Sequence, residues 1–129
     1  MSDQAPCDHL EHGIRLFNDG EYFECHEVLE LAWTPERGPR RLFLQSLIHV
    51  AVGLYHVGRG NPVGASRQLG KALRKLYGYL PAYEGVDTAR LYRDASEALE
   101  RIEAGGAPAE IAIYRTVRNH PKLTNVNRW

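Results

Sequence analysis

The segment from Arg40 to Gly58 constrains the fold more than any other part of the chain. Its apolar residues fall on almost every side of a helix rather than in one stripe, which is typical of a helix at the centre of a bundle. The segment is too short, and has too many polar or small residues, to cross a membrane. The interruptions are Gln45, Ser46, His49, Gly53 and His56.

Apolar residues at helical spacing predict four more helices around this central one. We expect them at about residues 8–18, 21–33, 61–80 and 88–104, separated by turns that contain glycine or proline. Asn61-Pro62 is a specific start signal, with an N-cap residue followed by proline at the first helical position. Residues 109–117 are compatible with a short helix, and residues 120–129 with an extended segment laid over the bundle. No strand pattern competes.

The chain therefore reads as all-α, a single domain over residues 1–129. Residues 1–7 are expected to form a flexible tail, and residues 105–129 a C-terminal extension. Residues 8–80 contain a faint repeat, because a shift of 40 positions superposes Gly20 on Gly60, Cys25 on Ala65, Leu29 on Leu69 and Ala32 on Ala72. Each half then reads as helix, glycine turn and helix, so we expect two tetratricopeptide-like antiparallel hairpins plus a fifth helix packed across them.

The charge balance excludes some classes of partner. The 129 residues include 16 basic and 16 acidic side chains, so no overall field draws the chain to nucleic acid or to an anionic membrane. The first residues have neither the basic region nor the apolar region of a signal peptide. Cys7 and Cys25 do not form a disulfide framework, and Cys25 lies on an apolar helix face. We therefore expect a cytoplasmic protein.

The stretch F-N-D-G-E-Y-F-E-C-H-E-V-L-E-L-A-W, residues 17–33, carries a specific motif. Together with Gly38-Pro39, Phe43-Leu44-Gln45, Leu47-Ile48 and the Tyr55-His56…Arg59-Gly60-Asn61 turn, it resembles a small all-helical domain family of unknown function. The family signature reads F-N-x-G-x-[FY]-[FW]-E-x-H-E-x-[LW]-E-x-x-W, and the resemblance covers about residues 10–80. Ser46 stands where glycine is usual, which affects packing only. The resemblance implies a compact helical bundle and no particular reaction.

The second predicted helix carries an unusual polar face. Glu24, Glu27 and Glu30 form one stripe with His26 at its edge. Because Phe23 and Leu31 lie among these carboxylates, we expect the face to be partly covered. Gln45, His49 and His56 form a polar stripe on the central helix, together with Ser46 and Gly53. The short loop after Trp33 makes the two helices antiparallel neighbours, which predicts a groove with Glu30 near Gln45, His26 near His49 and Glu24 near Gly53.

Three interpretations of this Glu/His groove follow. It is a structural network without a ligand, or a site for a small ligand or a protein partner, or a metal site. In the last case His26, Glu27 or Glu30, and His49 would hold a divalent metal that activates water for hydrolysis. The preferred prediction is a groove that binds a small ligand or partner. The alternatives are a metal-dependent hydrolase at this groove and a helical protein-interaction module whose polar cluster is purely structural. Such a module would use an exposed apolar face of the hairpins, for example for self-association. No phosphate loop, nucleophile elbow or Cys-x-x-Cys motif is present.

Overall fold

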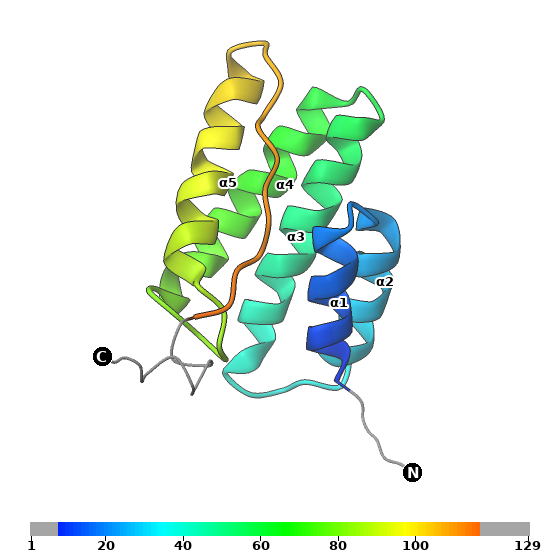
Figure 1. Cartoon of the computed structure of the whole chain (residues 1–129), viewed down its shortest axis with the longest axis vertical. Helices are drawn as coiled ribbons and strands as arrows, with labels where there is room; N and C mark the ends of the chain where they lie inside the picture. Colours follow the sequence, from blue (N-terminus) through cyan, green and yellow to red (C-terminus); the bar gives the residue numbers. More distant parts are fainter. Residues whose placement is uncertain (1–7, 117–129) are drawn as a thin grey trace, which may run out of the picture.

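The computed structural model describes residues 8–116 and forms a helical bundle (Figure 1). Its α-helices are α1 (His9–Asn18), α2 (Tyr22–Trp33), α3 (Arg40–Gly58), α4 (Pro62–Leu76) and α5 (Thr88–Glu103). The described residues contain isolated β-bridges but no β-strand. The all-α prediction is confirmed, and the central helix has the predicted bounds. The predictions for residues 1–7 and for residues 117–129 lie outside the described residues.

Helix α3 lies at the centre of the bundle, as its composition predicts. It packs against α2 on one side and α4 on the other, while α1 covers α2 and α5 covers α4 (Figure 1). Phe43, Leu44, Leu47, Val50 and Ala51 of α3 are completely buried. A helix with neighbours on several sides needs apolar residues on several sides, which explains why its pattern lacks a single stripe. Ser46 is also buried, and its hydroxyl donates to the Phe43 carbonyl at 2.6 Å.

The two halves of residues 8–80 make the same close helix contact. A β-carbon at Gly13 of α1 would lie 2.6 Å from Leu29 of α2, and one at Gly53 of α3 would lie 3.1 Å from Leu69 of α4. These two pairs are related by the same 40-residue shift that relates the turns. The turn glycines also correspond, since Gly20 has φ +82° and Gly60 has φ +72°. Both hairpins therefore use glycine where the helices approach most closely and at the turn that follows.

The predictions for the fourth and fifth helices need two corrections. Helix α4 ends at Leu76, not near Leu80, and a short 3₁₀ helix (Tyr77–Tyr79) follows it. Helix α5 packs along α4 rather than across both hairpins. The start signals are confirmed. The side chain of Asn61 accepts from the Gly64 amide with Pro62 directly after it, and the side chain of Asp87 accepts from the Arg90 amide.

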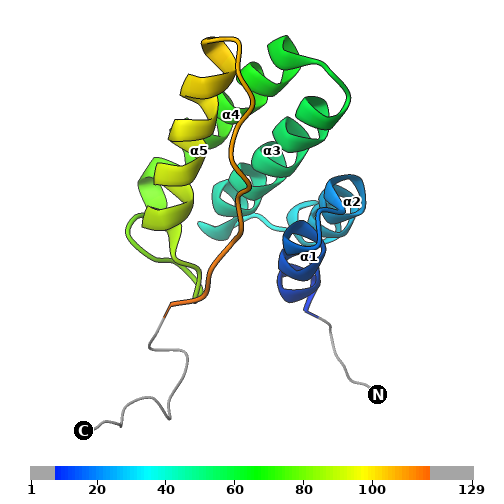
Figure 2. The ribbon, with the colours of Figure 1, turned by 45° about the horizontal axis from the view of Figure 1, so that its top comes forward.

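The segment after α5 is extended, so the short helix suggested for residues 109–117 is wrong for the part that the structure describes. Residues 107–116 run between α5 and α1 (Figures 1 and 2). Ile111 and Ile113 are buried, and this alternation is the period of extended chain rather than of a helix. Asn18 at the end of α1 holds the segment: its amide donates to the Ile113 carbonyl at 3.0 Å and accepts from the Ile113 amide at 2.8 Å.

The far end of the segment is attached to the loop before α5. The Asp87 amide donates to the Tyr114 carbonyl at 2.8 Å, and the Thr116 amide donates to the Gly85 carbonyl at 2.9 Å. Arg115 forms a salt bridge with Glu11 of α1. The segment thus connects the first and last helices of the bundle. Within residues 8–116, no helix has the length and apolarity needed to cross a membrane.

Candidate functional site

The carboxylate face of α2 is open to solvent. Glu24, Glu27 and Glu30 are exposed, and the side chains of Phe23 and Leu31 between them are 48% and 59% exposed. The expectation that neighbouring parts of the chain cover this face is therefore wrong. Only Cys25 and Leu29 of α2 are buried, and burial raises the pKa of the Cys25 thiol to about 12.

His26 is satisfied within α2 itself. Its Nε2 lies 3.3 Å from the Glu30 carboxylate, one helical turn away, and its Nδ1 lies 3.2 Å from the Phe23 carbonyl oxygen. An exposed pair of this kind contributes little to stability. Within residues 8–116, neither Glu24 nor Glu27 forms a salt bridge.

The polar stripe of α3 turns towards α4, not towards α2. His49 Nδ1 lies 2.8 Å from Gln68 Oε1 of α4, and Gly53 faces Leu69. His56 contacts Asn61, the N-cap of α4, at 3.3 Å. Burial, with further contributions from Lys75, Lys71 and Arg74, lowers the pKa of His49, although the Gln68 hydrogen bond opposes that shift. His49 is therefore a neutral histidine at the α3–α4 contact.

The two predicted stripes do not form one groove. His26 and Glu30 lie together on α2, and Gln45 is half-buried on α3, but His49 and His56 belong to the contact with α4. No three His, Cys, Asp or Glu side chains among residues 8–116 come together in a group that could hold a metal ion. The hydrolase alternative, with His26, Glu30 and His49 as ligands, therefore has no metal site in this part of the chain.

A shallow hollow of about 350 Å³ lies where the start of α2 meets the end of α3. Glu24 is the member of the predicted set that lines it, beside Phe23, Tyr55 and Arg59. The Phe23 and Tyr55 rings are 5.6 Å apart, and the Arg59 guanidinium lies 5.8 Å from the Tyr55 ring. Phe23 therefore rests on Tyr55 with its outer side in solvent. The hollow is continuous with the exposed face of α2, since Phe23 and Glu24 belong to both.

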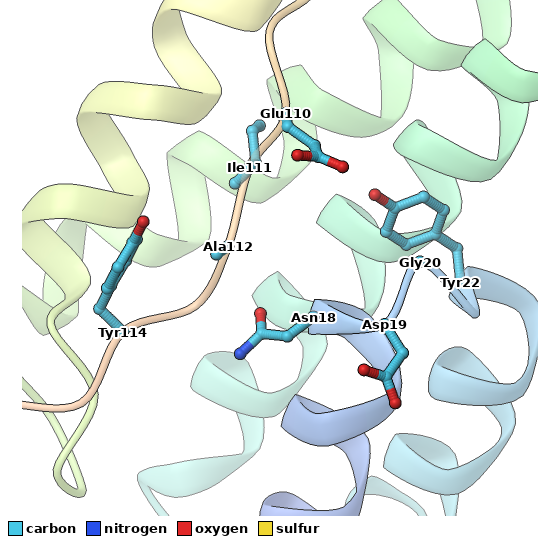
Figure 3. Close-up of a pocket in the computed structure, with 8 residues that line it drawn as sticks. All are labelled: Asn18, Asp19, Gly20, Tyr22, Glu110, Ile111, Ala112 and Tyr114. Atoms are coloured by element: carbon cyan, nitrogen blue, oxygen red, sulfur yellow. The ribbon is translucent and has the colours of Figure 1, made fainter.

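A second, more polar pocket of about 200 Å³ lies between the α1–α2 turn and the extended segment (Figure 3). The Tyr22 hydroxyl and the Glu110 carboxylate point towards one another across it (Figure 3). Burial, followed by the charge of Glu110, raises the pKa of Tyr22. The pocket is closed on one side by Ile111 and Ala112 of the extended segment, so it depends on the attachment of that segment by Asn18.

Sequence reasoning missed the role of Asn18 and of residues 110–114. The motif F-N-D-G was interpreted only as a turn, and nothing local in it specifies a contact with Ile113, which is 95 positions away. The one available signal was the alternation in Ile111-Ala112-Ile113, which favours extended chain over a helix.

Two comparisons with known proteins give a match to this chain. A domain family of unknown function (DUF309) matches residues 10–68, from α1 into α4. The chain is also 32% identical over 111 residues to the uncharacterized protein YpuF of Bacillus subtilis (strain 168). That alignment covers 84% of this chain and 64% of YpuF, so the chain spans less than two thirds of this relative's length. Neither match supplies an activity or a ligand.

Proposed function

We propose that this chain is a helical protein-interaction module that docks a partner on the exposed side of α2. The α2 face consists of Phe23, Glu24, Glu27, Glu30 and Leu31. The module has two tetratricopeptide-like hairpins, belongs to the DUF309 family and works in the cytoplasm. The matched range, which contains the motif of residues 17–33 and both glycine turns, supports the assignment to the family.

The exposure of Phe23 and Leu31 carries this proposal. Large apolar side chains that stay about half exposed in the middle of a charged helix face are typical of a docking surface. Covering the exposed part of each would contribute about 1 kcal/mol. The surrounding carboxylates select the partner, because Glu24 and Glu27 have no salt bridge within residues 8–116. The partner that fits is an amphipathic helix with leucine-type anchors beside lysine or arginine.

The test uses a synthetic amphipathic helix of leucine and lysine at helical spacing, titrated into the full chain at low protein concentration. We expect Phe23→Ala and Leu31→Ala each to weaken binding about fivefold, which corresponds to the loss of about 1 kcal/mol. Tyr77→Ala is the matched control, since Tyr77 is 68% exposed but lies in the short 3₁₀ helix, outside α2. Equal affinities of all three variants and the unaltered chain would show that the α2 face is not the docking surface.

A further inference from the structure

Helix α4 carries a basic face, opposite in charge to the acidic face of α2. The α4 face consists of Arg67, Lys71, Arg74 and Lys75. Within residues 8–116, none of these four side chains forms a salt bridge. Burial lowers the pKa of Lys75, and the charges of Arg74 and Lys71 lower it further. The basic charges therefore repel one another, and no salt bridge within residues 8–116 offsets the repulsion, although Arg67 lines a hollow with Glu103 of α5.

The two charged faces overlap in part when the hairpins are superposed by the 40-residue shift. The 40-residue shift that relates Leu29 to Leu69 also relates Phe23 to Val63 and Glu27 to Arg67. Phe23 and Val63 are both exposed apolar side chains, whereas Glu27 and Arg67 have opposite charges. At this shared position the two faces thus carry opposite charges. Although the chain as a whole has no net charge, α2 and α4 carry regions of opposite sign.

We propose that the partner of the α2 face is a second copy of this chain, which docks through its α4 face. This inference rests on the proposed function and names the partner of the same surface. The complementary charges of the two faces argue for it: the carboxylates at positions 24, 27 and 30 meet the basic side chains at positions 67, 71 and 74 of the other copy.

The arrangement of the helices allows both contacts to form in one closed dimer. Helices α2 and α4 lie on two sides of α3 (Figure 1) and both run antiparallel to it. Contacts with α3 fix the level of each helix along it: Phe23 of α2 lies beside Tyr55, and Gln68 of α4 lies beside His49. Because both helices run antiparallel to α3, positions related by the 40-residue shift lie at about the same level. A two-fold axis along α3 brings α2 of each copy to α4 of the other. The two contacts are then identical, as expected for a closed symmetric dimer.

The exposed apolar residues supply the part of the contact that salt does not screen. Leu42 of α3 is 49% exposed and, with Phe23 and Val63, adds apolar area to the charged edges. Exposed ion pairs weaken as ionic strength rises, because the Debye length falls to about 3 Å at 1 M salt. We therefore expect the dimer dissociation constant to rise with salt. The rise should be smaller than the number of ion pairs alone would give, because the apolar contacts are not screened.

Sedimentation equilibrium of the full chain tests the proposal. The unaltered chain should show the mass of a dimer. Glu27→Lys with Glu30→Lys makes both faces basic, and Arg67→Glu, Lys71→Glu and Arg74→Glu together make both acidic. Each set should raise the dimer dissociation constant at least about tenfold, since like charges then face one another. All five positions are exposed, so these changes leave the core untouched.

The mixture of the two altered chains is the decisive measurement. Each chain alone should be monomeric, whereas an equimolar mixture should regain the mass of a dimer, because every basic face again meets an acidic one. A monomeric unaltered chain, or a dimer that survives both sets of changes, would overturn the second-copy proposal. If the unaltered chain is monomeric yet binds the leucine–lysine helix through Phe23 and Leu31, the proposed function stands and only this inference fails.

Discussion

Replacing Asn18 with alanine tests how the extended segment is held. The Asn18 amide makes two hydrogen bonds to the backbone of Ile113, at 3.0 and 2.8 Å, and both are partly buried. Each hydrogen bond contributes about 1 kcal/mol net, so Asn18→Ala should lower the free energy of unfolding by about 2 kcal/mol. With an m-value of about 2 kcal/mol per molar urea, the unfolding midpoint should fall by about 1 M.

Hydrogen exchange locates the effect. The amide of Ile113 should exchange faster in Asn18→Ala, because local release of residues 110–114 no longer has to break the contact with α1. Asp19→Ala is the matched control. Asp19 lies in the same turn and lines the same pocket, but its side chain is exposed and forms no salt bridge within residues 8–116. Unchanged exchange at Ile113 in Asn18→Ala would refute the assignment of Asn18 as the attachment point.

Three further predictions concern the core and its titratable groups. Gly13→Ala should destabilise the chain by about 1–3 kcal/mol, because the added β-carbon would lie 2.6 Å from Leu29. At Gly70 an added β-carbon would only touch the flexible Arg74 side chain, at 3.7 Å, so Gly70→Ala should stabilise by about 0.5–1 kcal/mol in urea unfolding. The pKa of His49 is lowered in the folded chain, so the unfolded chain binds the proton first as the pH falls. The free energy of unfolding should therefore decrease as the pH drops below about 6.5 and level off below the folded-state pKa. His49→Gln should remove this step from unfolding curves measured over a series of pH values. Burial raises the pKa of Cys25 to about 12, so its thiol should be unreactive in the folded chain. In a Cys7→Ser background, iodoacetamide at about pH 8 should label Cys25 only after urea unfolds the chain. Rapid labelling of the folded chain would show that this thiol is accessible.

Most helix boundaries were predictable because their signals are local. Asn61 and Pro62 start α4 in the predicted way, and Gly20 and Gly60 take the left-handed conformation that the turns need. The continuous apolar character of Arg40–Gly58 correctly placed α3 at the centre. Where the prediction failed, the deciding contact was not local: residues 109–116 are extended because Asn18 and the loop before α5 take their backbone hydrogen bonds.

The candidate site was harder to predict than the fold. The residues of the predicted groove are all polar side chains on α2 and α3, but their two stripes turn away from each other. An amphipathic helix fixes its own rotation by burying its apolar stripe. Helix α3 has no single stripe, so its pattern was equally compatible with His49 facing α2 and with His49 facing α4. The contact with Gln68 shows the second arrangement.

By itself, the sequence determined the helices, their order and the residues available for each surface, since capping, glycine turns and periodicity act within a few positions. Only the tertiary structure decided which residues share a surface. It left Phe23 and Leu31 in solvent among the carboxylates, turned His49 into the contact with α4, and attached Ile113 to Asn18. These outcomes depend on how helices rotate and pack against distant parts of the chain, and the free energy that settles them comes from contacts that no short stretch of sequence contains.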